Sequence, residues 1–221
     1  MKNPSAVISA LRLIFWGGLL CIIDLHFSQT TSRNGVESGF RFDLLNDVFG
    51  MILIGLGIRT LSRLDVNRSY AKEMGFIFMA CIVGGIVAID SHFLYEDPAL
   101  IALLRIGAGM VTLAATLIFC VAMGRVAEKF GLPRSLKSWK TTKVLVIVLW
   151  VAPLGLSYTS SIINIIGGGD FSIDLGPMVI PILLLFLWPL VHTFISTSRM
   201  KNEIEGAGKM LSASSVLFKD G

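Results

Sequence analysis

Long apolar runs alternate with short polar segments along the whole chain, and the run at residues 40–63 shows the pattern most clearly. It opens with Asp43 and Asp47, continues as a glycine-punctuated apolar stretch, and ends with Arg59 and Arg63. This is typical of a helix that crosses a bilayer, with an acidic and a basic end. The repeated pattern predicts an all-α membrane protein with six transmembrane helices, arranged as three helical hairpins. The predicted helices are residues 4–27, 40–63, 74–89, 98–123, 144–166 and 175–197.

Composition supports lipid as the solvent for most of the surface. The 221 residues are 54% hydrophobic and only 15% charged, and the mean hydropathy is +0.76. Soluble domains contain about 25% charged residues. The net charge of +4 is no sign of nucleic-acid binding, because the basic residues lie in short loops and form no block with interleaved aromatic residues.

The distribution of basic residues predicts the orientation. Most of the 19 lysines and arginines lie in the N-terminus, the loop at residues 59–73, the segment at residues 124–143 and the C-terminal tail. The positive-inside rule therefore places both termini in the cytoplasm. We expect a transmembrane domain at residues 1–200 and a polar cytoplasmic tail at residues 201–221, frayed from Arg199 onward.

Two polar segments are predicted to lie between membrane spans. Residues 28–41 form an outer loop with turn signals at Asn34-Gly35 and Ser38-Gly39. Residues 125–143 are too charged to span, are broken by Gly131 and Pro133, and place Trp139 at the membrane interface. In the last helix, Pro177 fits the first turn, and Pro181 and Pro189 are predicted to kink it.

Carboxylates and imidazoles gather at the predicted outer side, and these groups are ligands of divalent metals. The same residues suit helix caps and solvated loops, or a proton or substrate pathway, so three alternatives stay open. Asp24 and Asp90 fit the capping alternative least, because the helix dipole disfavours a carboxylate at a C-terminus. The candidate metal ligands are Asp24, His26, Asp43, Asp47, Asp90 and His92.

Arg105 lies about two turns inside a predicted helix, and a charge at that depth is rarely unpaired. We expect a buried ion pair with Asp47, with Asp43, Asp24 and Asp90 as alternative partners. His192, in the inner half of the last helix, is predicted to form a hydrogen bond between helices.

Small residues and cysteines complete the set of features inside the apolar runs. Ala80, Gly84 and Ala88 recur at four-residue spacing, which allows a neighbouring backbone to approach closely. Glycine-rich helices of this kind also suit a homo-oligomer or a larger membrane complex. The three cysteines are predicted to be small buried hydrophobic residues. They are Cys21, Cys81 and Cys120.

Residues 43–57, D-L-L-N-D-V-F-G-M-I-L-I-G-L-G, resemble a segment of uncharacterised small multi-pass bacterial membrane proteins. There a D-[IL]-L-P-D-x-[IL]-G-x-I-L-I-x-x-G pattern opens a transmembrane helix after a polar loop. Here Asn46 stands where proline is usual, and Met51 where tyrosine is common. The resemblance implies a bacterial membrane setting and no activity. Together with the six predicted helices, it leads us to expect a multi-pass protein of the cell inner membrane.

The sequence contains no hydrolase elbow, phosphate-binding loop or zinc-protease motif, and no cofactor is predicted. We expect a non-enzymatic membrane protein, either a small transporter-like unit or an accessory or assembly subunit. The alternative is a membrane-embedded metal-dependent enzyme that uses the outer Asp and His residues. A metal enzyme needs three or four of these side chains to converge, whereas a transporter needs a cavity that reaches the middle of the membrane.

Overall fold

The computed structural model describes residues 4–22, 26–33, 36–43, 47–90, 98–167 and 179–217. Two strands within these ranges, β1 (His26–Arg33) and β2 (Val36–Asp43), form an antiparallel hairpin. The remaining described elements are helical. They are α1 (Pro4–Ile22), α2 (Asp47–Leu61), α3 (Arg68–Asp90), α4 (Pro98–Lys129), α5 (Pro133–Val146), the π-helical turn η1 (Ile147–Val151), α6 (Ala152–Gly167) and α7 (Val179–Leu217).

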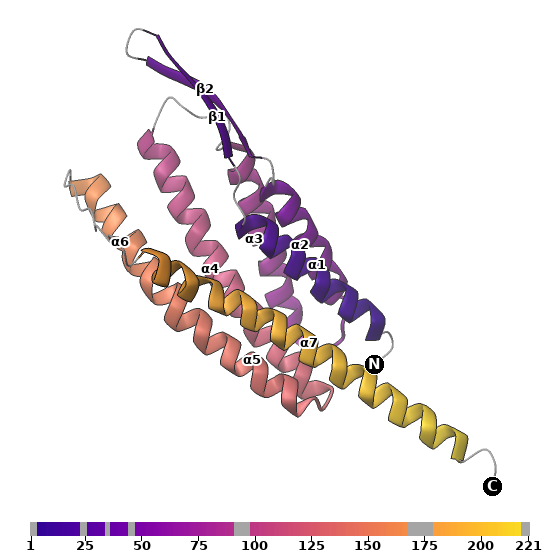
Figure 1. Ribbon diagram of the computed structural model, residues 1–221. Coiled ribbons are helices and arrows are strands. Elements are labelled where there is room, and N and C mark those ends of the chain that lie inside the picture. Colours follow the sequence, from indigo (N-terminus) through magenta and orange to yellow (C-terminus); the bar gives the residue numbers. More distant parts are fainter. Residues whose placement is uncertain are drawn as a thin grey trace.

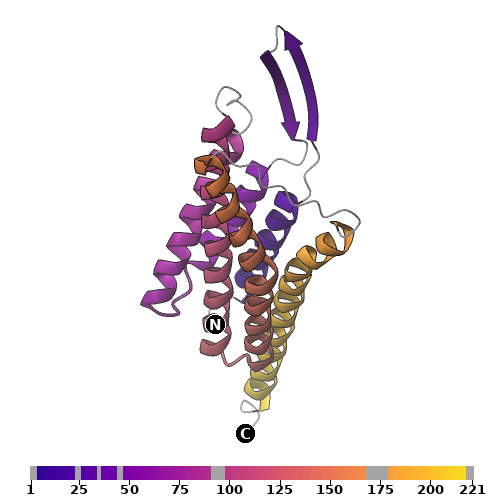
Figure 2. The same ribbon diagram turned by 90° about the vertical axis from the view of Figure 1, so that its left-hand side faces the viewer.

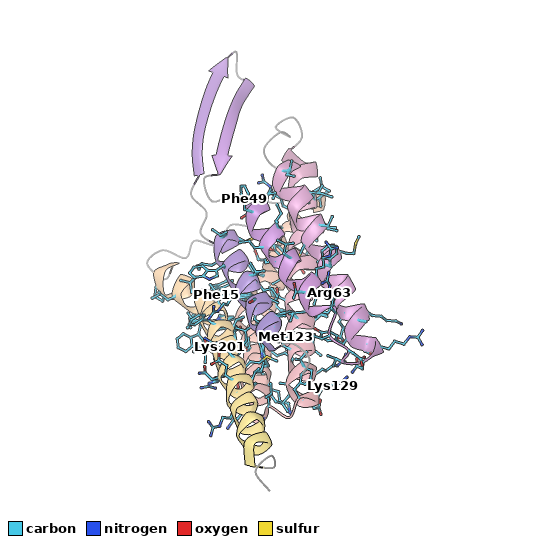
Figure 3. The ribbon with its side chains drawn as sticks, turned by 90° about the vertical axis from the view of Figure 1, so that its right-hand side faces the viewer. Phe15, Phe49, Arg63, Met123, Lys129 and Lys201 are labelled. Carbon is cyan, nitrogen blue, oxygen red and sulfur yellow. The ribbon has the colours of Figure 1, made fainter. Side chains whose placement is uncertain are left out.

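The helices form a bundle closed into a ring, with the hairpin projecting from one end (Figure 1). α1 packs against α2, α2 against α3, α3 against α4, and α4 against α5. α5, η1 and α6 form one continuous rod, and α7 packs against α5 and returns to α1. Phe15 of α1 lies beside α7 (Figure 3), and its ring centroid is 4.8 Å from that of Phe194. α1 begins and α7 ends at the end opposite the hairpin, which we call the inner end.

The bundle has the apolar length and surface of a membrane protein, as the sequence predicts. Three helical stretches of the described chain are long and apolar enough to cross a membrane, namely Arg68–Ile89, Leu103–Lys129 and Pro133–Ile163. α1 adds a shorter apolar stretch, Ala6–Cys21. Large hydrophobic side chains cover the outside of the bundle, and Leu156, for example, is 74% exposed. Such a surface is stable when lipid surrounds it.

Several helices extend further than the sequence predicts. α3 begins at Arg68 instead of residue 74, because Asn67 caps it: its Oδ1 accepts the Tyr70 N–H at 2.7 Å. α4 continues to Lys129, and the tail that was expected to fray from Arg199 is helical to Leu217. Pro177 lies outside the described residues, and Pro181 lies in the first turn of α7, where proline is tolerated.

The outer loop predicted at residues 28–41 is a β-hairpin, so the all-α prediction holds for the bundle and not for this segment. Its register pairs His26 with Asp43 and Arg33 with Val36. Two residues, Asn34-Gly35, separate the strands, and Asn-Gly is the dipeptide that two-residue hairpin turns favour most.

The segment at residues 125–143 breaks where the sequence predicts, and its tryptophan does not lie at the interface. Gly131 adopts a left-handed φ of 64°, and Pro133 opens α5. Trp139 is fully buried between α5 and α4, where its ring meets that of Phe119 edge-on at 5.6 Å. The side chain therefore packs inside the bundle instead of facing the membrane surface, because α5 turns one face inward even in this charged stretch.

α1 and α2 pack backbone to backbone through glycines. A Cβ added to Gly17 would lie 2.5 Å from the carbonyl oxygen of Gly50, and one added to Gly57 would lie 2.7 Å from that of Ala10. Small residues let helix backbones approach closely, and van der Waals contact then holds the helices together in lipid. The sequence placed this contact on α3 instead, where Gly84 meets the side chain of Met51 and not a backbone.

Glu203 of α7 caps α5 at the inner end. Its carboxylate accepts the Arg134 N–H at 3.0 Å, the Ser135 N–H at 2.8 Å and the Ser135 hydroxyl. Burial alone raises the pKa of the Glu203 carboxyl, but the hydrogen bonds from Ser135 and Arg134 and the Arg134 charge outweigh it, so that the pKa lies below its ordinary value. The cap ties the C-terminal half of α7 to the start of α5.

We expect Gly17→Ala to destabilise the protein by about 1–3 kcal/mol, because the added methyl group forces α1 and α2 apart. Gly18→Ala is the matched control, since a Cβ at Gly18 meets nothing within 4 Å. Thermal unfolding in detergent measures both variants. Equal melting temperatures for the two would contradict the backbone contact.

We expect Glu203→Ala to cost about 0.5–2 kcal/mol at neutral pH, because the first amides of α5 lose their acceptor. Since the folded-state pKa is lowered, the contribution of Glu203 is present above the unfolded pKa and is lost as the pH falls through the folded one. The difference in melting temperature between parent and variant should therefore shrink in acid. Glu205→Ala is the control, as Glu205 is half exposed and pairs only with Lys201 among the described side chains. If the difference in melting temperature persists at low pH, the charge of Glu203 does not cause the stabilisation.

Candidate binding cavity

A cavity of about 360 Å³ lies inside the ring of helices. α1, α2, α3, α4, η1 and α7 all contribute side chains to its wall. Most of the wall is apolar, with Ile14, Ile54, Ile77 and Leu190 as examples. Small-molecule sites are concave, mainly apolar and about 300–1,000 Å³ in volume, so this cavity is at the small end of that range.

Three threonines supply the hydroxyl groups in the described part of the wall: Thr112, Thr116 and Thr193. The Thr116 hydroxyl donates to the carbonyl oxygen of Thr112 at 2.9 Å, and the Thr193 hydroxyl donates to that of Pro189 at 2.8 Å. Each hydrogen is thus used within its own helix, and the oxygen keeps lone pairs that accept hydrogen bonds. The hydroxyl oxygens of Thr116 and Thr193 therefore suit a ligand that donates a hydrogen bond.

Trp150 reaches the cavity because the rod formed by α5, η1 and α6 widens into a π-helical turn at that point. The Ala152 N–H bonds to the carbonyl oxygen of Ile147, five residues earlier. Pro153, which has no N–H, follows directly, and a widened turn absorbs the missing hydrogen bond. The Trp150 indole N–H donates to the carbonyl oxygen of Phe186 at 2.7 Å, which fixes the ring against α7.

All three cysteines line the cavity: Cys21, Cys81 and Cys120. Cys81 and Cys120 are buried and Cys21 is half-buried, and none forms a disulfide, as the sequence predicts. Asp47, in the first turn of α2, is the carboxylate of the described wall, and its backbone oxygen accepts a hydrogen bond from the Cys21 thiol at 3.7 Å. A helix N-terminus stabilises a carboxylate at this position.

The inner end of the ring is filled by side chains that are less than 2% exposed, among them Leu61, Tyr70, Met74, Met123 and Trp139. The Tyr70 hydroxyl donates to the carbonyl oxygen of Leu61 at 2.8 Å and locks this layer. The layer separates the cavity from the inner end of the bundle.

His192 forms the predicted hydrogen bond between helices. Its Nδ1 is 2.9 Å from the Thr142 hydroxyl of α5, which is 2.8 Å from the Ser196 hydroxyl. Ser196 in turn lies 2.8 Å from the Ser138 hydroxyl. Buried polar groups must be satisfied inside lipid, and this network joins α5 to α7 without reaching the described cavity wall.

The predicted metal ligands are only partly described. Asp24 and His92 lie outside the described residues, and only the backbone is described for His26, Asp43 and Asp90. Asp47 lines the cavity. Among the described side chains, no three of His, Cys, Asp or Glu gather closely enough to hold a metal ion. The metal site stays a prediction.

Arg105 is exposed on α4 and pairs with no carboxylate among the described side chains. The side chains of its other predicted partners, Asp24, Asp43 and Asp90, are not described, so the buried ion pair stays a prediction. The ion pair that the structure shows between α3 and α4 joins Glu73 and Arg125 toward the inner end.

Sequence reasoning missed the cavity, although a signal for it exists. Thr112, Thr116 and Cys120 recur at four-residue spacing in an apolar helix, and this spacing puts them on one face. No protein-family model, curated protein or solved structure matches the chain.

Proposed function

We propose that the chain is a six-span protein of the bacterial inner membrane, with both termini in the cytoplasm, which binds a small, mainly apolar molecule in its central cavity. The observation that supports this most is the cavity itself, because spans from the whole ring build its wall. The function is non-enzymatic and transporter-like, since a site between helices suits binding and release.

The direction of the helices supports the six-span topology. Successive spans run in opposite directions, with the rod formed by α5, η1 and α6 as one span (Figure 2). The turns that join α2 to α3 and α4 to α5 lie at the inner end. Lysines and arginines lie in the first turn and in the helix ends beside both turns, among them Arg63, Arg68, Lys129 and Arg134, as the positive-inside rule expects of the cytoplasmic side. The hairpin lies at the other end and faces outward.

The chemistry of the wall favours an apolar ligand with one hydrogen-bond donor. The wall is dominated by aliphatic and aromatic side chains, and Thr116 and Thr193 offer acceptors. An alcohol, phenol or amine with an apolar body fits the apolar wall and can donate to a threonine oxygen. That acceptor matters because a hydrogen-bond donor buried without an acceptor is costly.

Topology is tested with reporter fusions to truncated chains. We expect a cytoplasmic signal from fusions after Arg63, Gly131 and Met210, and an external signal from fusions after Gly35 and Tyr95, because the basic residues hold the first group inside. A cytoplasmic signal at Tyr95 would overturn the six-span topology.

The cavity is tested by modification of Cys120 with N-ethylmaleimide, in a variant with Cys21→Ser and Cys81→Ser, which removes the other two thiols and keeps side chains of nearly the same size in the wall. We expect Cys120 to react in native membranes at alkaline pH, where thiolate forms, because the cavity admits a molecule of this size. Gly18→Leu should slow the reaction several-fold, since Gly18 lines the cavity and a Cβ there meets nothing within 4 Å.

Gly107→Leu is the matched control for that substitution, because Gly107 is exposed, has equal room for a side chain and does not line the cavity. It should leave the rate unchanged. If Cys120 reacts only after denaturation, the cavity does not bind small molecules from the membrane.

A further inference from the structure

A second hollow of about 350 Å³ lies between α2 and α3 on the outside of the bundle. Its wall is almost wholly apolar and includes Ile52, Leu56, Ile82 and Ile86, each between 41% and 59% exposed. In a membrane these side chains face lipid tails. We call this hollow the α2–α3 groove.

The groove and the cavity share two wall residues, Met51 of α2 and Cys81 of α3. The two spaces therefore lie back to back, and these two side chains form the partition between them. Methionine is unbranched and flexible, and a cysteine side chain is small. The partition is thus made of the side chains that move or yield most easily.

The α2–α3 seam differs from other seams of the ring. Between α1 and α2 the backbones are in contact at Gly17 and Gly50, so that seam can open only if whole helices separate. At the α4–α6 seam, Tyr158 fills the space above Gly109, where its Cζ would lie 2.8 Å from an added Cβ.

At the α2–α3 seam, Gly84 has no backbone against it. The nearest atom to an added Cβ is the Met51 Cε at 2.9 Å, the free end of a flexible side chain. A rotation of Met51 about its side-chain bonds clears the seam and leaves both helices in place.

We propose that the ligand of the cavity is a molecule dissolved in the bilayer, which enters sideways through the α2–α3 groove by displacing Met51. This rests on the proposed function, because it names the source and the solubility class of the same ligand. The inner route is closed by the layer of Leu61, Tyr70 and Met123, whereas the groove already faces lipid. A molecule that dissolves among the lipid tails reaches Met51 and Cys81 without crossing water.

The experiment compares two reagents on the variant that retains Cys120 alone. N-cyclohexylmaleimide partitions into the bilayer, and a sulfonated maleimide stays in water. We expect the first to modify Cys120 in sealed membranes and the second to modify it many-fold more slowly. Met51→Trp should slow the lipid-soluble reagent several-fold because it blocks the partition, and Met51→Ala should accelerate it.

Phe49→Trp is the matched control. Phe49 is also on α2, near its hairpin end (Figure 3), is 64% exposed and lines neither the groove nor the cavity. It should leave both rates unchanged. If Met51→Trp fails to fold, the acceleration in Met51→Ala decides the matter alone.

The outcomes separate the two proposals. Equal rates for both reagents, or rates that do not respond to Met51, would overturn lateral entry and leave the cavity as a binding site. Failure of every reagent to modify Cys120 in the folded protein at alkaline pH, where thiolate forms, would overturn the cavity and the lateral route together. A rate set by Met51 and by lipid solubility supports both.

Discussion

The backbone contact between α1 and α2 is the constraint on which the rest of the bundle depends. In lipid, apolar surfaces gain little by leaving their solvent, so helices associate through close van der Waals packing. Gly17, Gly50 and Gly57 allow that packing, and it sets how α1 and α2 are turned about their axes. With those glycines turned toward the partner helix, Gly18 and Ile54 face the cavity. The positions of these glycines therefore determine which residues of α1 and α2 line the cavity.

The sequence predicted the helical bundle well because lipid imposes a simple rule of one long apolar run for each span. It predicted local chemistry well where one residue decides the outcome, as at Gly131, Pro133 and His192. It failed where tertiary contact decides. Charge alone suggested that the tail beyond Arg199 frays, but Glu203 finds the amides of α5 and Ile204 is buried. The sequence did not predict the cavity, because its wall is built from helices all around the ring, and the polar face of α4 supplies only one part of it.

The polar groups of the bundle divide into two kinds by position. At the inner end they form closed networks, in which Ser138, Thr142, His192 and Ser196 satisfy one another between α5 and α7. Around the cavity they are sparse, and hydroxyls such as that of Thr193 are bonded to their own helix. In a medium of low dielectric constant, closed networks hold helices rigidly together. The inner end is therefore the fixed part of the bundle, and the side chains around the cavity are held mainly by apolar contacts.

α7 also has a consequence for biosynthesis. It closes the ring by packing against both α5 and α1, and its Glu203 supplies the acceptor for the first amides of α5. α7 is synthesised after the other helices of the bundle, so until it is made the ring is open and the start of α5 is uncapped. Closure of the ring therefore depends on the synthesis of α7. A chain that ends before Glu203 has no acceptor from α7 for the first amides of α5, so the two ends of the ring are not joined at this point.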